Sequence, residues 1–119
     1  MTLALRRERT LTESDQRTAE ELRATLLAHG LGCIRRIILY GSRARGTALP
    51  DSDFDLLVIE TDPVSKRAEM QRLRRAVHDL PYPVDVWVME EQEFEETKNV
   101  IGGLAYPAHK YGVVLYESA

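Results

Sequence analysis

The stretch GSRARGTALPDSDFD, residues Gly41–Asp55, separates two apolar segments of the sequence. The segment Ile34–Tyr40 precedes it, and Phe54–Ile59, apolar throughout except at Asp55, continues from its end. Both segments have the length of a strand, and the second is apolar enough to be covered on both faces of a sheet. We therefore expect a strand, a turn rich in small residues, and a second strand that an Asp-x-Asp pair enters.

The beginning of this stretch has the composition of a phosphate-binding turn. Gly41 can adopt backbone angles that other residues avoid, which lets a ligand approach the main chain closely. Ser42 is a natural N-cap residue, so the following backbone N–H groups could point at a phosphate. Arg43 and Arg45 add guanidinium groups, which pair bidentately with phosphate oxygens. Two other phosphate motifs are excluded, because the lysine of a Walker loop and the third glycine of a dinucleotide fingerprint are both missing.

Three aspartates could hold a divalent cation beside that turn. Asp53 and Asp55 are two residues apart on an expected strand, so both carboxylates project from the same face. Such anions repel each other and need a cation between them, and Mg²⁺ commonly binds through one or two carboxylates and substrate phosphates. Asp85 lies between Val84 and Val86 in the next apolar strand, and it would complete the cluster if the two strands are neighbours. A pair of metal ions held in this way supports in-line phosphoryl or nucleotidyl displacement.

The overall composition indicates a single globular domain, residues 10–119, after an N-terminal arm of residues 1–9. The 119 residues are 44% hydrophobic and 29% charged, which provides a core and argues against disorder. We expect a cytoplasmic protein without a membrane partner, because the sequence has no apolar run of membrane-spanning length and no secretory signal. Cys33 is the single cysteine, which excludes an intrachain disulfide and a cysteine-based zinc site. The net charge of −3 argues against duplex nucleic acid as a partner.

Helices are expected between the strands. The spacing of Thr10 and Glu13 predicts a capping box before a helix that Gly30 ends. Asp62-Pro63 is the expected start of a second helix, which Pro81 ends. A glutamate-rich helical turn over residues 90–96, a short helix and a final strand complete the chain. This alternation predicts an α/β or α+β domain around a small mixed sheet flanked by helices.

Gly41-Ser42, ten residues, Asp53-x-Asp55 and the later Asp85 form a pattern that resembles the minimal nucleotidyltransferases of the DNA polymerase β superfamily. The GSRARG run, the DSDFDLLV strand and the ending YGVVLYE are also similar to small members of that family. The likeness extends from Leu39 to Glu117. It implies a polymerase β-like nucleotidyltransferase fold and the transfer of a nucleotide with release of pyrophosphate.

The resemblance also implies which residues act. The nucleoside triphosphate, ATP in this family, would bind through the glycine turn and its arginines, and a pair of Mg²⁺ ions would bind to the aspartates. Asp85 would also help to deprotonate or orient the attacking hydroxyl. The implied residues are Gly41, Ser42, Arg43 and Arg45 for the nucleotide, and Asp53, Asp55 and Asp85 for the metal and for catalysis.

The same resemblance implies a partner. Small members are typically encoded beside a HEPN-domain toxin, and in characterised pairs the nucleotidyltransferase is an antitoxin that transfers AMP to a tyrosine of the toxin. A hetero-oligomer with a HEPN-domain protein is therefore expected. The alternatives are a non-catalytic nucleotide-binding module that neutralises its partner by contact, and a small-molecule nucleotidyltransferase. The aspartates favour the enzyme, because a masking protein has no need for carboxylates that repel one another.

Aromatic residues give a weaker signal. Trp87 and Tyr111 are expected in the core rather than against a nucleotide base. Tyr40 and Trp87 could instead flank the nucleotide, and the sequence leaves that alternative open. Arg74 belongs to a group of arginines that we expect on a solvated helix face.

Overall fold

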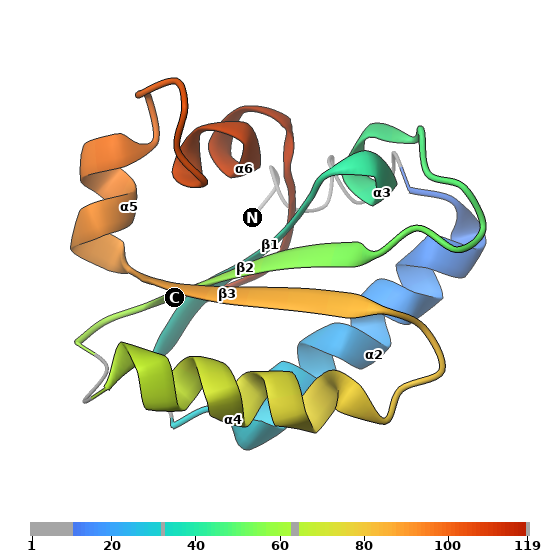
Figure 1. The fold of residues 1–119 in the computed structure, drawn as a ribbon, viewed down its shortest axis with the longest axis horizontal. Coiled ribbons are helices and arrows are strands. Elements are labelled where there is room, and N and C mark those ends of the chain that lie inside the picture. Colours follow the sequence, from blue (N-terminus) through green and yellow to red (C-terminus); the bar gives the residue numbers. More distant parts are fainter. Residues whose placement is uncertain (1–10, 32, 63–64, 119) are drawn as a thin grey trace.

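The computed structural model describes residues 11–31, 33–62 and 65–118. It shows a four-stranded sheet with helices on both faces (Figure 1). The elements in chain order are α2 Glu13–His29, β1 Ile34–Tyr40, α3 Ser42–Arg45, β2 Phe54–Glu60, α4 Lys66–His78, β3 Val84–Glu90, α5 Glu91–Thr97, α6 Ala105–Tyr111 and β4 Val113–Glu117. The expected N-terminal arm, residues 1–9, lies outside the described residues.

The sheet is mixed, as the sequence predicted, and its strand order is β3-β2-β1-β4. Strand β1 pairs antiparallel with both β2 and β4, whereas β2 and β3 run parallel. A parallel pair needs a crossover connection, which α4 provides. Both β2 and β3 therefore begin at the same edge of the sheet, and residues at their starts lie side by side.

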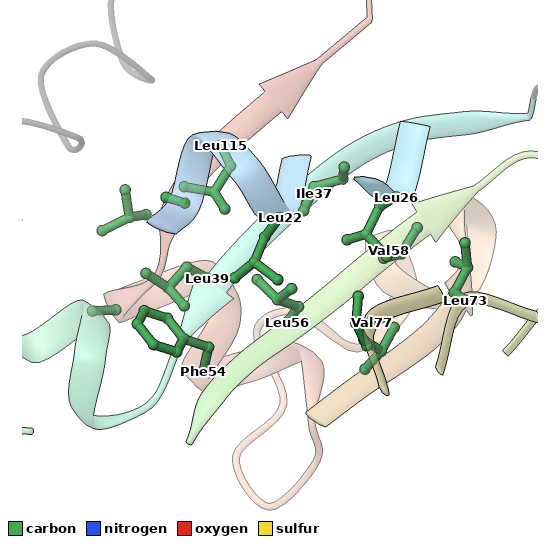
Figure 2. Packing of buried hydrophobic residues seen from close by; sticks show 14 of the residues in the cluster. Leu22, Leu26, Ile37, Leu39, Phe54, Leu56, Val58, Leu73, Val77 and Leu115 are labelled. Atoms are coloured by element: carbon green, nitrogen blue, oxygen red, sulfur yellow. The ribbon is translucent and has the colours of Figure 1, made fainter. Parts of the chain in front are cut away.

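Helices α2 and α4 cover one face of the sheet (Figure 1). Figure 2 shows the apolar side chains that meet there; the helices contribute Leu22, Leu26, Leu73 and Val77, and the strands contribute Ile37, Leu39, Phe54, Leu56, Val58 and Leu115. All of these side chains are buried. Burial of this apolar surface is the main driving force that fixes α4, and with it the parallel crossover, against the sheet.

Helices α5 and α6 cover the opposite face. Their buried residues Phe94, Ala105 and Ala108 pack against Leu57 and other side chains of that face. Since side chains alternate along a strand, Asp55 lies on the same face, two residues before Leu57. The prediction that β2 is covered on both faces is confirmed, because every residue from Leu56 to Glu60 is buried.

Two helices begin at other residues than the sequence predicted. Helix α2 has Thr12 as its N-cap, with the side-chain oxygen of Thr12 accepting from the N–H of Asp15 at 3.1 Å; the expected Thr10 lies outside the described residues. The prediction that Asp62 caps α4 is wrong, because Ser65 caps this helix and accepts from the N–H of Ala68 at 3.2 Å; Pro63, the other residue of the predicted start, lies outside the described residues. Asp62 has a φ of 43°, whereas an N-cap residue needs extended backbone. None of the described helices is both long and apolar enough to cross a membrane.

Candidate active site

Strands β2 and β3 place two of the predicted metal ligands opposite each other. Asp55 is the register partner of Asp85 in the parallel pair, so the expectation that the two strands are neighbours is confirmed. Burial raises the pKa of the Asp55 carboxyl, and the nearby charges of Asp85 and Asp53 raise it further. Three carboxylates thus repel one another at the shared beginning of β2 and β3, which is the electrostatic condition that a bound cation relieves.

Gly41 lies directly against this cluster. Its φ of 78° belongs to the left-handed region, and a Cβ atom at this position would overlap Asp55 Oδ2. Tyr40, the residue before it, pairs with Asp55 across β1 and β2. Burial, together with the charges of Asp55 and Asp85, raises the pKa of the Tyr40 hydroxyl, which therefore remains protonated beside the carboxylates.

The predicted phosphate-binding turn contains a single helical turn, α3, which begins at Ser42. The carbonyl of Gly41 accepts from the N–H groups of Ala44 at 3.1 Å and Arg45 at 3.2 Å, which closes this turn. Gly46 ends it in the left-handed conformation, with a φ of 77°. Figure 1 shows α3 at the edge of the sheet where β2 and β3 begin, so Gly41 and Ser42 lie at the same edge as the aspartates.

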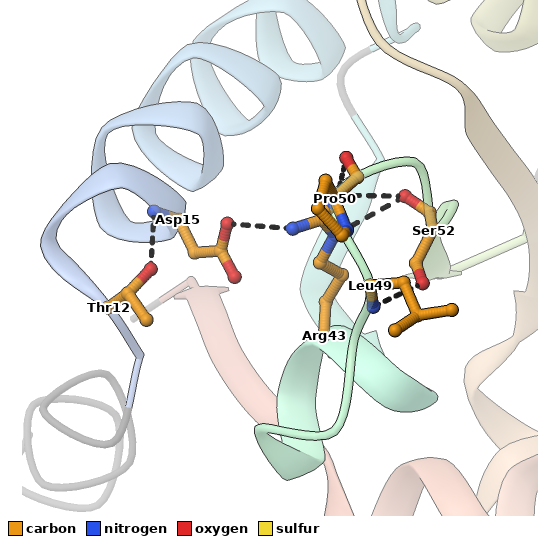
Figure 3. Close-up of polar contacts among 6 residues, drawn as sticks. All are labelled: Thr12, Asp15, Arg43, Leu49, Pro50 and Ser52. Atoms are coloured by element: carbon orange, nitrogen blue, oxygen red, sulfur yellow. Dashed lines mark hydrogen bonds and ion pairs between the residues drawn. The ribbon is translucent and has the colours of Figure 1, made fainter.

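The two arginines of the turn have different surroundings. Arg43 is directed toward α2 and braces the following loop, as Figure 3 shows. Its guanidinium donates to Ser52 O at 3.0 Å, to Pro50 O at 3.0 Å and to Asp15 Oδ1 at 3.3 Å. It also lies over the Phe54 ring, 4.4 Å from the centroid. A phosphate contact by Arg43 would have to compete with these bonds.

Arg45 is exposed and lies on the other side, over the ring of Tyr111 in α6 at 4.5 Å. Helix α6 covers the face that bears Asp55, so Arg45 is the arginine of the turn that is directed toward the carboxylates' side of the sheet. Tyr111 is 44% exposed, and the expectation that it belongs to the core is wrong. Contact between Arg45 and a nucleotide stays a prediction.

Asp85 has two partners, Arg74, which the sequence did not assign to the site, and Trp87, for which it left a place beside the nucleotide open. Trp87 donates from Nε1 to Asp85 Oδ2 at 3.0 Å, and Arg74 Nη2 lies 4.0 Å from Asp85 Oδ1. Trp87 is 40% exposed, so the expectation that it belongs to the core is also wrong. The two-residue spacing of Asp85 and Trp87 on a strand was a usable signal, because it places both on one face. No comparable signal pointed to Arg74, which lies on a different element.

The residues around Asp55 fit a divalent cation. They offer three carboxylates, which are the oxygen ligands that Mg²⁺ prefers, and one of them, that of Asp55, lies directly against the backbone of Gly41. The carboxylate oxygens of the three aspartates, however, lie farther apart than the ligand atoms of one ion do. Among the described residues, three ligating atoms within 4.8 Å of one another occur at Cys33, Glu60 and Glu69.

That second group lies at the end of β2 farthest from Asp55. Protonation of Glu60, rather than a metal ion, accounts for the close approach of its two carboxyl groups. Cys33 Sγ donates to Glu60 Oε1 at 3.0 Å, and both glutamates are fully buried. Within the described part of the chain, Glu60 Oε2 and Glu69 Oε1 have no hydrogen-bond partner, and Arg72 Nε lies 3.9 Å from Glu69 Oε1. Burial, with Glu69 as neighbour, raises the pKa of Glu60 to about 8, which favours the protonated form of Glu60 beside Glu69.

Opposed carboxylates that can share a divalent cation, as Asp55 and Asp85 are placed, are a feature of enzymes that transfer a phosphoryl or nucleotidyl group. A sequence model described as Nucleotidyltransferase domain matches residues 19–106, more than half of the chain. The chain therefore belongs to the nucleotidyltransferase domain family, as the resemblance predicted, and it is a nucleotidyltransferase. No curated protein matched the sequence.

Solved structures share the fold. A putative nucleotidyltransferase from Sulfolobus solfataricus is 19% identical, with a TM-score of 0.60, and the match covers 98% of this chain and 89% of that one. A chain of the MntA–HepT toxin–antitoxin is 19% identical, with a TM-score of 0.57 and coverage of 87% and 74%. A chain of a toxin–antitoxin with AMP-PNP is 22% identical, with a TM-score of 0.53 and coverage of 83% and 73%. At these identities the likeness confirms the nucleotidyltransferase fold.

Proposed function

We propose that this nucleotidyltransferase transfers AMP from ATP to a hydroxyl, that of a tyrosine, on a partner HEPN-domain toxin, and so acts as the antitoxin of the pair. The observation that carries the chemistry is the register of Asp55 with Asp85, next to the main chain of Gly41. The family gives the reaction class. The choice of acceptor rests on the resemblance, supported by structural neighbours that are toxin–antitoxin proteins, one of them with AMP-PNP.

The residues divide the work by position. Gly41 and Ser42 would receive the triphosphate where α3 begins, and Arg45 would add a positive charge from the α6 side. Asp53, Asp55 and Asp85 would hold Mg²⁺, which when bound neutralises the phosphate oxygens and polarises the phosphorus for attack. Asp85, at the outer strand of the sheet, would orient the acceptor hydroxyl and accept its proton. The protonated Tyr40 can donate a hydrogen bond in the same cluster.

The test uses a matched pair of substitutions in the same turn. Asp53→Asn removes a proposed metal ligand together with its charge, whereas Asp51→Asn removes the same charge from an exposed position two residues earlier. Each protein is incubated with α-labelled ATP, Mg²⁺ and the HEPN-domain protein encoded beside it. We expect label on the partner with wild type and with Asp51→Asn, and a loss of at least roughly 100-fold with Asp53→Asn.

The outcomes separate the alternatives. Tight association with the partner and neutralisation of its toxicity by both wild type and Asp53→Asn, without label, would show a binding module. Label that appears on small hydroxyl compounds and never on a protein would show a small-molecule nucleotidyltransferase. Mapping the label to a tyrosine, and its loss when that tyrosine is changed to Phe, would identify the acceptor.

A further inference from the structure

Arg74 reaches the active-site face of the sheet from the opposite face. It belongs to α4, whose neighbouring residues Leu73 and Val77 are buried on the α2 side of the sheet. Strand β3 is one of the two edge strands of the described sheet. Arg74 Nε donates to the backbone oxygen of Val86 in this strand at 2.8 Å, so the side chain is anchored on the strand edge as it passes.

Beyond that anchor, the guanidinium meets Asp85 and Trp87. Arg74 Nη2 lies 4.0 Å from Asp85 Oδ1, and the guanidinium carbon lies 4.9 Å from the centre of the Trp87 ring. Trp87 Nε1 donates to the other oxygen, Asp85 Oδ2, at 3.0 Å. Each oxygen of the carboxylate therefore has its own cationic or N–H partner, and the two partners also contact each other.

This arrangement opposes a repulsion. Asp85 is the register partner of Asp55, and like charges on neighbouring strands favour side-chain rotamers that point apart. The charge of Arg74 offsets part of that repulsion, and the indole N–H fixes the orientation of the carboxylate. The bond from Arg74 to Val86 O keeps the guanidinium in place even though the ion pair is long and partly exposed. Such preorganisation of charged groups is what a catalytic site gains most from.

We infer that Arg74 and Trp87 are positioning residues. They contact the carboxylate of Asp85 from the outer edge of β3 and keep it in the orientation that nucleotidyl transfer requires. This inference rests on the proposed function of Asp85. It also gives a reason for the partial exposure of Trp87, whose polar N–H is directed at the active-site carboxylate.

The kinetic test compares Arg74→Gln with Arg75→Gln, an exposed arginine one position later on the same helix. Arg74→Gln is expected to lower kcat by roughly 10- to 100-fold, as the loss of a group that orients a ligand does, with the KM for ATP within about twofold. Arg75→Gln is expected to match wild type. In the Asp85→Asn background, Arg74→Gln should cause no further loss, because the residue acts through Asp85. An unchanged kcat, or an equal loss in both backgrounds, would overturn the inference.

A second measurement needs no activity. Trp87 is the single tryptophan of the chain, so one indole N–H signal appears in the NMR spectrum. Its hydrogen exchange should be slow in wild type and in Arg75→Gln, and faster in Asp85→Asn and in Arg74→Gln. Slow exchange in Arg74→Gln would show that the hydrogen bond from Trp87 to Asp85 does not depend on Arg74. If wild type transferred no nucleotide, the proposed function would fail, and the exchange rates would still decide whether Arg74 positions Asp85.

Discussion

Gly41 and Asp55 fit together so closely that the carboxylate of Asp55 occupies the space where a Cβ atom of residue 41 would lie. The contact links the end of β1 to the beginning of β2, where Tyr40 and Asp55 are already register partners. It brings the turn proposed to receive phosphates and the carboxylate proposed to bind metal to the same point. Each of the two residues therefore limits what can replace the other.

Gly41→Ala is expected to impair both folding and activity. The new methyl group would displace Asp55 Oδ2, and the φ of 78° with ψ of −160° is a conformation that residues with a Cβ atom rarely adopt. We expect a loss of about 1–3 kcal/mol in the free energy of unfolding and a large drop in kcat, measured by urea unfolding and by the labelled-ATP assay.

Gly46→Ala is the control for this change. Gly46 also has a positive φ, 77°, but a Cβ atom there would meet nothing within 4 Å. It should cost about 1 kcal/mol of stability and leave kcat nearly unchanged. Equal losses of kcat in the two variants would show that backbone strain, and not the contact with Asp55, is responsible.

Much of this arrangement could be predicted from the sequence, because local patterns determine it. The apolar runs gave β1, β2 and β3, and the position of Asp85 within an apolar strand predicted its approach to Asp55. The starts of α2 and α4 were less predictable, since Ser65 and Asp62 are both acceptable caps in isolation. The positive φ of Asp62 excludes it as the cap, and no local pattern in the sequence indicates that conformation.

Asp55→Asn should abolish transfer and yet stabilise the protein in the absence of metal. The pKa of Asp55 is raised in the folded state, so the folded state loses stability relative to the unfolded state as pH rises through the range between the two pKa values. The neutral amide of asparagine removes this cost. We expect a higher Tm than that of wild type, measured in EDTA above the pH range in which Asp55 titrates.

Addition of Mg²⁺ provides the control for that experiment. A cation that binds the folded state alone raises the Tm of wild type by mass action, and the rise should be missing in Asp55→Asn. Asp51→Asn, at an exposed position, should behave like wild type with and without Mg²⁺. A Tm of Asp55→Asn below that of wild type in EDTA would contradict the prediction.

The buried Glu60 should make stability fall as pH rises. Burial is the main reason why the pKa of Glu60 rises from its ordinary value of 4.5 to about 8 in the folded protein. Between these two pH values the folded state keeps a proton that the unfolded state releases, so the free energy of unfolding decreases across this window. Glu60→Gln should flatten the decrease, by an amount on the order of a few kcal/mol, in urea unfolding from pH 5 to pH 9.

Glu90→Gln is the matched control, because Glu90 is the register partner of Glu60 on β3 and is exposed. Its pH profile should follow wild type. A Glu60→Gln profile that still falls as steeply as wild type would show that another group causes the pH dependence. Transfer activity should be unaffected in both variants, because the Cys33–Glu60–Glu69 group lies at the opposite end of β2 from Asp55.

The different surroundings of Arg43 and Arg45 could not be predicted from the sequence. Two residues apart in one turn and identical in chemistry, they received the same prediction. The structure separates them, because a single helical turn directs one toward α2 and the other toward α6. The direction of each side chain depends on its contact with Asp15 or Tyr111. Both of these residues are distant in the sequence, so no local pattern predicts it.

Conservative substitutions should therefore affect the two arginines in different ways. Arg43→Lys keeps the charge but loses the fork that bonds Ser52 O, Pro50 O and Asp15, which should cost about 1–3 kcal/mol of stability. Arg45→Lys, at an exposed position, should change stability by less than about 0.5 kcal/mol and raise the KM for ATP, because lysine cannot bind phosphate oxygens bidentately. Urea unfolding and initial-rate kinetics on both variants measure this split. A raised KM in a fully stable Arg43→Lys, with Arg45→Lys equal to wild type, would reverse the roles assigned to the two residues.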